Sequence, residues 1–278
     1  MNGIYWIASY PKSGNTWFRT FISNLTSGID GPININEIST GSIASSRFLI
    51  EQALGFDTGD LTYDEIDQLR PSIYEWALKE SNEVGYYKIH DAYAYTKSGK
   101  PIVGNLSTLG VVYIIRNPLD VAVSSSHHWG CSLDDAITRM SDSNNALSSD
   151  VYGFTQQVRQ NLGTWSHHVR SWTEATGLNI KTIRYEDMIE KPVPTFTDAV
   201  HFLSMEYSEQ EIRRAIKFSE FNELAKQESM YGFREKPTHS KRFFRSGTFG
   251  GWRDVLTKDQ HDRIVMSHKN TMKKYGYI

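Results

Sequence analysis

The segment that most constrains the fold is Tyr10–Trp17, with the sequence YPKSGNTW, which follows an apolar run at Ile4–Ala8. An apolar run, a turn that contains Pro and Gly, and then a periodic apolar stretch predict a strand, a tight loop and a helix. Such a loop directs backbone N–H groups and the positive end of the helix dipole toward one point. Gly14 permits a close approach of a ligand, and Lys12 adds a positive charge. The segment therefore predicts an anion site, with phosphate as the favoured anion.

The loop departs from the Walker phosphate-binding pattern GxxxxGK[ST], in which Lys directly follows the second Gly. Here Lys12 lies two residues before Gly14 and Asn15 follows Gly14, so the loop lacks the Gly-Lys-Ser/Thr sequence in which the hydroxyl after Lys holds magnesium. Other side chains of the loop are suited to contact a nucleotide: Ser13, Thr16 and Trp17. For the loop taken alone, an ordinary strand-to-helix turn with a solvated Lys is the alternative.

The charge balance and the single cysteine exclude several function classes. The 278 residues contain 30 Lys and Arg against 32 Asp and Glu, a net charge of −2, which argues against general binding to nucleic acid or anionic membranes. Cys131 alone can form neither an internal disulfide nor a cysteine-based metal cluster. We find no signal peptide and no apolar run of about 20 residues. We therefore expect a cytoplasmic protein without a nucleic-acid or membrane partner; the oligomeric state, a homodimer included, stays open.

Apolar runs predict four strands: Ile4–Ala8, Glu83–His90, Gly110–Ile115 and Asn179–Tyr185. Helical patterns alternate with them, and the longest predicts a helix over Tyr152–Ala175. Capping boxes at Thr62 and Thr257 predict the starts of two further helices. Strands that alternate with helices indicate an α/β fold with a mostly parallel sheet covered on both faces. No composition shift marks a boundary, so we expect one domain over residues 1–278.

A second stretch, Val111–Ser124, places Arg116 directly after a fully apolar strand. Open α/β sheets bind ligands at the carboxyl ends of their strands. Ser124 lies about two helical turns further on, so a strand-end Arg and a helix Ser could grip one phosphate, the Arg with two bonds. The alternative is that Arg116 pairs with Asp120 while Ser124 only packs.

Lys88 and His90 lie at the end of the expected strand Glu83–His90, and strand alternation places both on one face. A His there can take a proton from a hydroxyl, and a Lys can stabilise charge on a transferring group. A lone His is more often structural, but the Lys partner and the strand-end position favour catalysis. The adjacent pairs His127–His128 and His167–His168 diverge on a helix and are interpreted as structural.

A fourth stretch, Arg242–Trp252, is a basic loop with glycines and aromatic residues. Together these stretches resemble the soluble, small-molecule sulfotransferases that use 3′-phosphoadenosine-5′-phosphosulfate (PAPS). The family loop YPKSGTTW is similar to Tyr10–Trp17, and an apolar strand followed by RNPxDxxxS is similar to Arg116–Ser124. The opening also looks like bacterial sulfotransferases that modify glycopeptide antibiotics.

The other family motifs follow in the same order along the chain. The family K-x-H is similar to Lys88 and His90, and its YEDM to Tyr185–Met188. Its RKGxxGDW is similar to Arg245–Trp252, with Ser246 in place of Lys and Gly251 in place of Asp. The resemblance thus covers nearly the whole chain, and Ser246 removes one cation from the expected phosphate site.

The resemblance implies a P-loop-kinase-like three-layer sandwich and in-line transfer of a sulfuryl group from PAPS to a small-molecule hydroxyl, or less favourably an amine. His90 would be the general base, with Lys12 and Lys88 balancing charge, and no metal would be required. The implied contacts to PAPS are Lys12, Ser13, Gly14, Asn15, Thr16, Trp17, Arg116, Ser124, Tyr185, Ser219, Phe221, Arg245, Ser246 and Gly247. Two alternatives remain: a nucleotide or small-molecule kinase, and a non-catalytic nucleotide-binding protein of the same fold.

Overall fold

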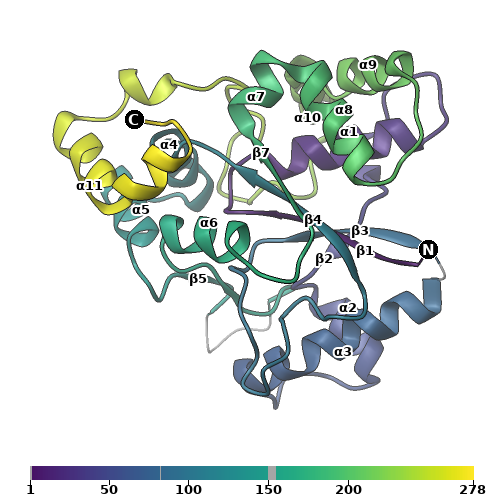
Figure 1. Cartoon of the computed structure of the whole chain (residues 1–278). Helices are drawn as coiled ribbons and strands as arrows, with labels where there is room; N and C mark the ends of the chain where they lie inside the picture. Colours follow the sequence, from purple (N-terminus) through teal and green to yellow (C-terminus); the bar gives the residue numbers. More distant parts are fainter. Residues whose placement is uncertain (1, 82, 150–154) are drawn as a thin grey trace. The chain divides into compact units, whose positions relative to one another are not determined.

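The computed structural model describes residues 2–81, 83–149 and 155–278 (Figure 1). Within them the chain forms two compact units, each assembled from three segments. Unit 1 comprises Met1–Tyr10, Gly41–Tyr113 and Asp142–Thr182, and unit 2 comprises Pro11–Thr40, Ile114–Ser141 and Ile183–Ile278. That the chain behaves as a single domain stays a prediction.

The central sheet has five strands in the order β2-β3-β1-β4-β7. Their bounds are β1 (Gly3–Ser9), β2 (Gly41–Ile43), β3 (Val84–Ile89), β4 (Thr108–Ile115) and β7 (Ile180–Arg184). Strand β3 pairs in parallel with both β1 and β2. The mostly parallel sheet, flanked by helices, confirms the predicted P-loop-kinase-like α/β class.

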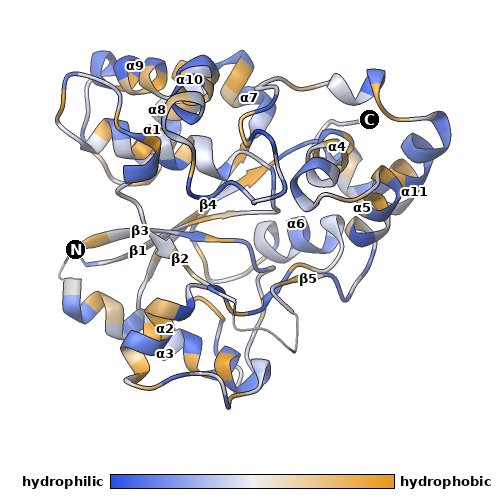
Figure 2. Cartoon of the chain, turned by 180° about the vertical axis from the view of Figure 1, so that it is seen from behind, coloured by the Kyte–Doolittle hydropathy of each residue, from blue (hydrophilic) through white to orange (hydrophobic). Residues whose placement is uncertain are grey.

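Burial explains why the apolar runs predicted the strands correctly. All seven residues of β1 are buried, and so are the last six of β4. Figure 2 shows hydrophobic residues along these central strands. A strand covered on both faces has no side to give to polar residues, so its sequence is apolar without alternation.

Unit 1 also contains helices α2 (Arg47–Leu54), α3 (Tyr63–Ser81) and α6 (Trp165–Thr173), with a short antiparallel pair of β5 (Ala146–Leu147) and β6 (Gln160–Asn161). The capping box before α3 is confirmed: the Glu65 carboxylate accepts from the Thr62 N–H at 2.8 Å. The Thr62 hydroxyl in turn accepts from the Glu65 N–H at 3.3 Å. Pro71 lies inside α3, which continues through it.

The predicted helix over Tyr152–Ala175 is wrong in its first half. Residues 150–154 lie outside the described part, and the described residues 155–164 contain β6 instead of a helix. Helix α6 begins only at Trp165, where the Thr164 side chain caps it. Gly163 precedes this cap with a φ of 60°, in the left-handed region, and its N–H donates to the Asn145 carbonyl. The turn and the strand pairing therefore override the helical spacing of the apolar residues.

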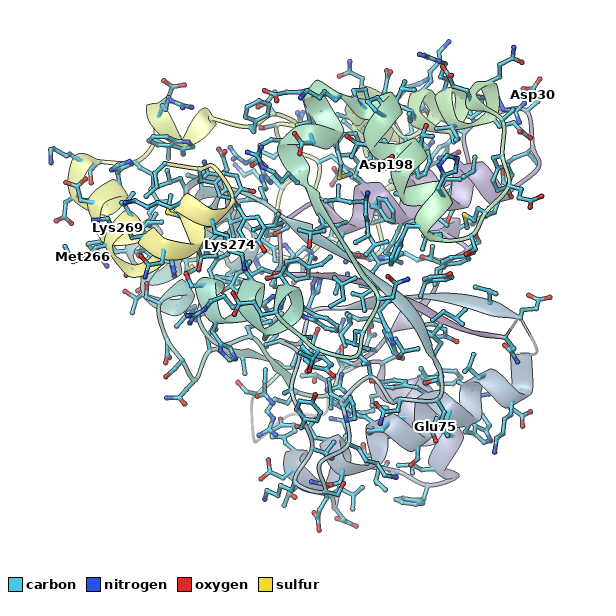
Figure 3. The ribbon with its side chains drawn as sticks, viewed as in Figure 1. Asp30, Glu75, Asp198, Met266, Lys269 and Lys274 are labelled. Carbon is cyan, nitrogen blue, oxygen red and sulfur yellow. The ribbon has the colours of Figure 1, made fainter. Side chains whose placement is uncertain are left out.

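Unit 2 contains helices α1 (Asn15–Thr26), α4 (Pro118–Trp129), α5 (Leu133–Met140), α7 (Tyr185–Glu190), α8 (Pro192–Phe202), α9 (Glu209–Phe218), α10 (Phe221–Tyr231) and α11 (Lys258–Lys274). Short 3₁₀ helices lie at Ile35–Glu37 and Gly251–Asp254. Helix α11 begins at the predicted capping box, buries Ile264 and His268, and turns Met266 and Lys269 outward (Figure 3). Within the described residues, no helix has the length and hydropathy needed to cross a membrane.

Candidate active site

The loop before α1 has the backbone geometry of an anion site. Lys12 and Gly14 both adopt left-handed conformations, with φ values of 70° and 102°. Such a conformation is unusual for a residue other than Gly, and it is found preferentially at functional sites. Gly14 is the N-cap of α1 and has no side chain, so the N-cap residue itself makes no side-chain hydrogen bond to the first turn of the helix. An anion can take the place of the cap, and the helix dipole favours its charge.

Gly14 is required for a steric reason as well. A Cβ atom at this position would lie 2.6 Å from Cδ2 of Tyr185, the first residue of α7. The Tyr185 ring lies edge-on to Trp17, with the ring centroids 5.8 Å apart, and carries the Arg116 guanidinium at 4.1 Å from its centroid. Burial raises the pKa of the Tyr185 phenol, with Arg116 opposing the shift. The structure thus brings four predicted site residues into one cluster.

Arg116 joins two loops through backbone carbonyls. Its Nη1 donates to the Lys12 carbonyl at 3.0 Å, and its Nη2 donates to the Thr248 carbonyl at 3.1 Å. The alternative pairing of Arg116 with Asp120 is wrong. Asp120 is buried and accepts instead from the backbone N–H groups of Gly250 at 2.8 Å and Trp252 at 3.2 Å.

The late loop contributes Arg245, Ser246 and Gly247. Gly247 has a φ of 64°, and a Cβ there would lie 2.2 Å from the Phe221 ring, so Phe221 packs directly on this glycine. The Ser246 hydroxyl lies 3.0 Å from that of Thr248. The pKa of Arg245 is lowered, first by burial and second by the positive charge of Arg116. Two guanidinium groups that repel each other indicate a place where an anion would be stabilised.

Two buried carboxylates hold the late loop in position. Asp120 on α4 binds the backbone at Gly250 and Trp252, as described above. Glu228 on α10 accepts from the backbone N–H groups of Phe243 at 2.7 Å and Phe244 at 2.9 Å. The loop thereby places the Phe243 ring 4.1 Å from the Lys12 ammonium, a cation–π contact. The sequence suggested no role for Glu228 and only an ion pair with Arg116 for Asp120, because an acceptor of backbone N–H groups has no characteristic spacing.

A third carboxylate holds the turn after Arg116. Glu186 is buried and accepts from the Asn117 N–H at 2.9 Å and from the Tyr277 hydroxyl at 3.1 Å. Burial raises the pKa of Glu186, and the Asn117 N–H opposes the shift. The YEDM motif therefore supplies two contacts. The Tyr185 ring lies against the Arg116 guanidinium, and the Glu186 carboxylate accepts from the Asn117 N–H.

Two predicted ligands of the nucleotide, Ser124 and Ser219, have no hydrogen bond to the other predicted ligands among the described residues. Ser124 is half-buried on α4, and no hydrogen bond among the described residues joins it to Arg116. Ser219 is fully buried, and its hydroxyl donates to the Ala215 carbonyl at 2.7 Å, which leaves only its lone pairs for a ligand. For both residues, contact with a nucleotide stays a prediction.

Lys88 and His90 belong to unit 1. His90 follows the last residue of β3, and its Nδ1 lies 2.8 Å from the Ser9 carbonyl. A carbonyl only accepts, so Nδ1 carries a proton, and whenever the ring is neutral the lone pair is on Nε2. This is the tautomer that a general base requires. Lys88 is half-buried on β3, and the meeting of Lys12, Lys88 and His90 around one sulfuryl group stays a prediction.

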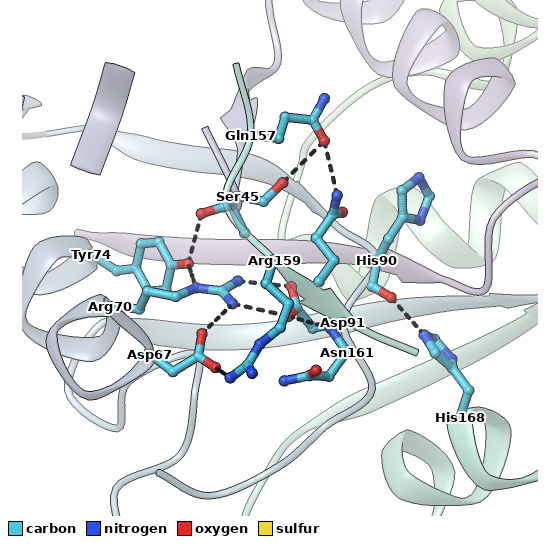
Figure 4. A network of polar contacts seen from close by, with 12 residues as sticks. Ser45, Asp67, Arg70, Tyr74, His90, Asp91, Gln157, Arg159, Asn161 and His168 are labelled. Carbon is cyan, nitrogen blue, oxygen red and sulfur yellow. Dashed lines mark hydrogen bonds and ion pairs between the residues drawn. The ribbon is translucent and has the colours of Figure 1, made fainter. Parts of the chain in front are cut away.

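A buried polar network lies behind His90 (Figure 4). The guanidinium of Arg70 donates to both carboxylate oxygens of Asp91, at 2.9 and 2.7 Å. Arg70 Nε donates to the Tyr74 hydroxyl at 2.9 Å, which donates to the Ala44 carbonyl at 2.8 Å. The Arg70 side chain is fully buried, and Figure 4 shows the His90 ring turned away from this ion pair.

Among the described residues, no group of three or more His, Cys, Asp or Glu side chains is arranged to hold a metal ion. Catalysis without a metal nevertheless stays a prediction, because it depends on the reaction. The structure offers cations from Lys and Arg side chains instead.

Comparison with known proteins agrees with the geometry. The family model of the sulfotransferase domain matches residues 4–276. Sulfotransferase 1B1 of Canis lupus familiaris is 25% identical over 273 residues, which cover 96% of this chain and 82% of that protein. Sulfotransferase 2A6 of Rattus norvegicus is 30% identical over 155 residues, covering 54% of this chain and 52% of the relative. The latter match thus spans about half the length of the curated relative.

Two solved structures share the fold. A mouse sulfotransferase, SULT7A1, complexed with PAP has a TM-score of 0.61 at 18% identity, covering 98% of this chain and 85% of that one. Retinol dehydratase in complex with retinol and PAP also has a TM-score of 0.61 at 18% identity, covering 97% of this chain and 81% of that one. At this identity the likeness concerns the fold alone.

Proposed function

The chain belongs to the sulfotransferase family, and from that premise we propose that it transfers a sulfuryl group from PAPS to a hydroxyl of a small-molecule acceptor. The observation that carries the proposal is the pair of anion sites in unit 2. One is the start of α1, where the left-handed Lys12 and the N-cap Gly14 form the loop, and the other is the Arg116–Arg245 pair. A donor with phosphate groups at both its 5′ and 3′ positions matches two such sites.

Unpartnered polar atoms support the fit of PAPS. The Ser13 hydroxyl and Arg116 Nε are buried and have no hydrogen-bond partner among the described residues. A buried polar atom without a partner is costly, and a bound anion would supply the missing bond to these two donors. Gly14 and Gly247 leave no room for a Cβ atom against the rings of Tyr185 and Phe221, two further residues of the predicted site.

The predicted PAPS contacts all lie in unit 2, and we call them the phosphate-loop cluster. Each is assigned here to the part of PAPS that it would contact. The 5′-phosphosulfate would be held by Lys12, Ser13, Gly14, Asn15 and Thr16. The 3′-phosphate would be held by Arg116, Ser124, Arg245, Ser246 and Gly247. The adenine would lie near Trp17, Tyr185, Ser219 and Phe221.

The hydrogen bond of His90 Nδ1 to the Ser9 carbonyl supports a reaction in which Nε2 acts as the base. When bound, PAPS supplies the sulfuryl group and leaves as 3′-phosphoadenosine-5′-phosphate (PAP). His90 Nε2 takes the proton of the acceptor hydroxyl as its oxygen attacks sulfur, and the Nδ1–H bond to Ser9 keeps the ring in the required tautomer. Lys12 and Lys88 stabilise the charge on the sulfuryl group and the bridging oxygen. Sulfuryl transfer resembles phosphoryl transfer, in which positioning and charge stabilisation supply most of the acceleration.

The experiment is incubation of the protein with sulfur-labelled PAPS and a panel of phenols, alcohols, sugars and amines. We expect label to appear on a hydroxylated acceptor, with one PAP formed for each transfer, and with full activity in excess EDTA. Phosphorylation of an acceptor by ATP that requires magnesium would overturn the proposal in favour of a kinase. Tight PAP binding without turnover on any acceptor class would favour a non-catalytic binding protein.

A further inference from the structure

The segment that follows β3 is anchored to one face of α6. The His90 carbonyl accepts from His168 Nε2 at 2.9 Å, as Figure 4 shows. The next carbonyl, that of Asp91, accepts from Trp172 Nε1 at 2.9 Å. His168 and Trp172 lie one turn apart on α6, so they project from the same face of the helix. Two consecutive carbonyls at the proposed base are thus fixed by one helix.

The protonation state of His168 is determined by its two partners. Its Nε2 faces a carbonyl, which only accepts, so Nε2 carries the proton. Its Nδ1 then carries a lone pair, which accepts from the Tyr113 hydroxyl at 2.9 Å. Both residues are fully buried, and burial lowers the pKa of His168 to about 4. His168 is therefore neutral near pH 7, with both ring nitrogens engaged.

An apolar side chain would fill the same volume without the cost of burying two polar ring atoms. The imidazole of His168 instead donates one of its two hydrogen bonds to the backbone carbonyl of His90. On the other side of the same segment, the carboxylate of Asp91 is held by Arg70. A ring that only filled space would need no donor directed at this carbonyl.

We propose that His168 is a positioning residue for His90. The His168 Nε2–H holds the His90 carbonyl while the Ser9 carbonyl holds the His90 ring, so Nε2 of His90 is presented in one orientation. The inference rests on the proposed function, in which His90 is the general base. A shift of about 1 Å in such a base can cost as much as 10²-fold in rate.

The test compares His168→Gln with His168→Asn. The Gln amide reaches the position of Nε2 and keeps the donor, whereas the shorter Asn amide does not. We expect His168→Asn to lower the single-turnover rate on an alcohol by about 10-fold, the value of one hydrogen bond, and His168→Gln to retain most of it. With an acidic phenol, which needs less help from a base, the loss in His168→Asn should be about threefold or less. PAP affinity should stay within about twofold of the wild type.

The matched control is His268→Asn. His268 on α11 is also a buried histidine whose pKa burial lowers to about 4, but it belongs to unit 2. It should lose stability without changing the ratio of the alcohol and phenol rates. Equal rates for His168→Gln and His168→Asn, or an equal loss on both acceptors, would overturn the inference. His90→Ala separates the proposed function from the positioning role. Wild-type turnover in His90→Ala would refute the proposed function. Loss of turnover in His90→Ala, together with wild-type behaviour of His168→Asn, would refute only the positioning role of His168.

Discussion

The phosphate-loop cluster and the side chains bonded to the His90–Asp91 segment differ in how completely their polar atoms are satisfied. Ser13 Oγ and Arg116 Nε lack partners among the described residues, and the pKa of Arg245 is lowered, first by burial and second by the charge of Arg116. Around His90, by contrast, Asp91 binds Arg70 through both oxygens, and His168 uses both ring nitrogens.

The difference follows from what each region has to bind. A site for a highly charged nucleotide must keep some hydrogen-bond donors unbonded in the absence of the ligand, because the ligand supplies their partners. A general base has to be held in one tautomer and one direction before the acceptor arrives, so its supports are satisfied by the protein itself. The first region should therefore gain stability on binding nucleotide, and the second should carry its stability without a ligand.

The largest expected effect is a loss of turnover without a loss of nucleotide affinity, and we expect it for a substitution of His90. His90→Ala should lower turnover on an alcohol by about 10²–10⁴-fold, the usual contribution of a positioned base, and leave PAP affinity nearly unchanged. The loss should be smaller with an acidic phenol. Lys12→Ala should weaken nucleotide binding and also slow transfer, because Lys12 contacts the donor before and during the reaction. Steady-state kinetics and calorimetry on both variants check this, and wild-type turnover in His90→Ala would make His90 structural.

The ion pair behind His90 should dominate stability. Arg70→Met leaves the Asp91 carboxylate buried and uncompensated, so the free energy of unfolding should fall by about 3–5 kcal/mol. Arg213→Met is the matched control, because Arg213 pairs with Glu209 on the exposed face of α9 and should contribute about 1 kcal/mol or less. Urea unfolding measures both. Equal losses in the two variants would contradict the special role of the buried pair.

Acid should destabilise the protein through its buried histidines. Burial lowers the pKa of His168 and of His268 to about 4, whereas an exposed His has a value near 6.5. Between these values the unfolded chain binds more protons than the folded one, so stability is complete above about pH 6.5 and is lost as the pH falls toward 4. Each residue should account for a loss of up to roughly 3 kcal/mol. Urea unfolding from pH 7 to 4 should show a shallower decline in His168→Gln, and an unchanged slope would contradict the assignment.

The smallest expected effect concerns the cation that Ser246 replaces. Ser246→Lys adds a charge to an exposed position of the late loop, next to Arg245. PAP affinity should rise by about 2–5-fold, as expected of one exposed charge contact, and the gain should disappear at high salt. AMP, which has no 3′-phosphate, serves as the control ligand. A similar gain for AMP would show that the loop does not face the 3′-phosphate.

The sequence predicted the elements whose side chains are buried on both faces. Strand β4 is the clearest case, since its last six residues are all apolar and buried. The same reasoning failed for Tyr152–Ala175: Val158 and Leu162 are buried as their spacing suggested, but they lie outside any helix. Burial alone does not distinguish a helix from an irregular segment, and Gly163 with the cap at Thr164 decides where α6 begins.

For the site, motif residues were predictable and their supports were not. Arg116 and Tyr185 were recognised from their motifs and lie in contact. The anchors Asp120 and Glu228 were missed because they bind backbone N–H groups of distant residues, which no local pattern records. His168 was interpreted as structural, and only its hydrogen bond to the His90 carbonyl reveals the connection.

The central claim is that the phosphate-loop cluster holds a nucleotide with a 3′-phosphate, and calorimetric titration with PAP and with AMP tests it most directly. One charged contact is worth about 1.5–3 kcal/mol, so PAP should bind at least about 10-fold more tightly than AMP. Arg116→Ala should remove most of that difference while AMP affinity changes little. Equal affinities of the wild-type protein for PAP and AMP would contradict the second phosphate site, and with it the assignment of PAPS as the donor.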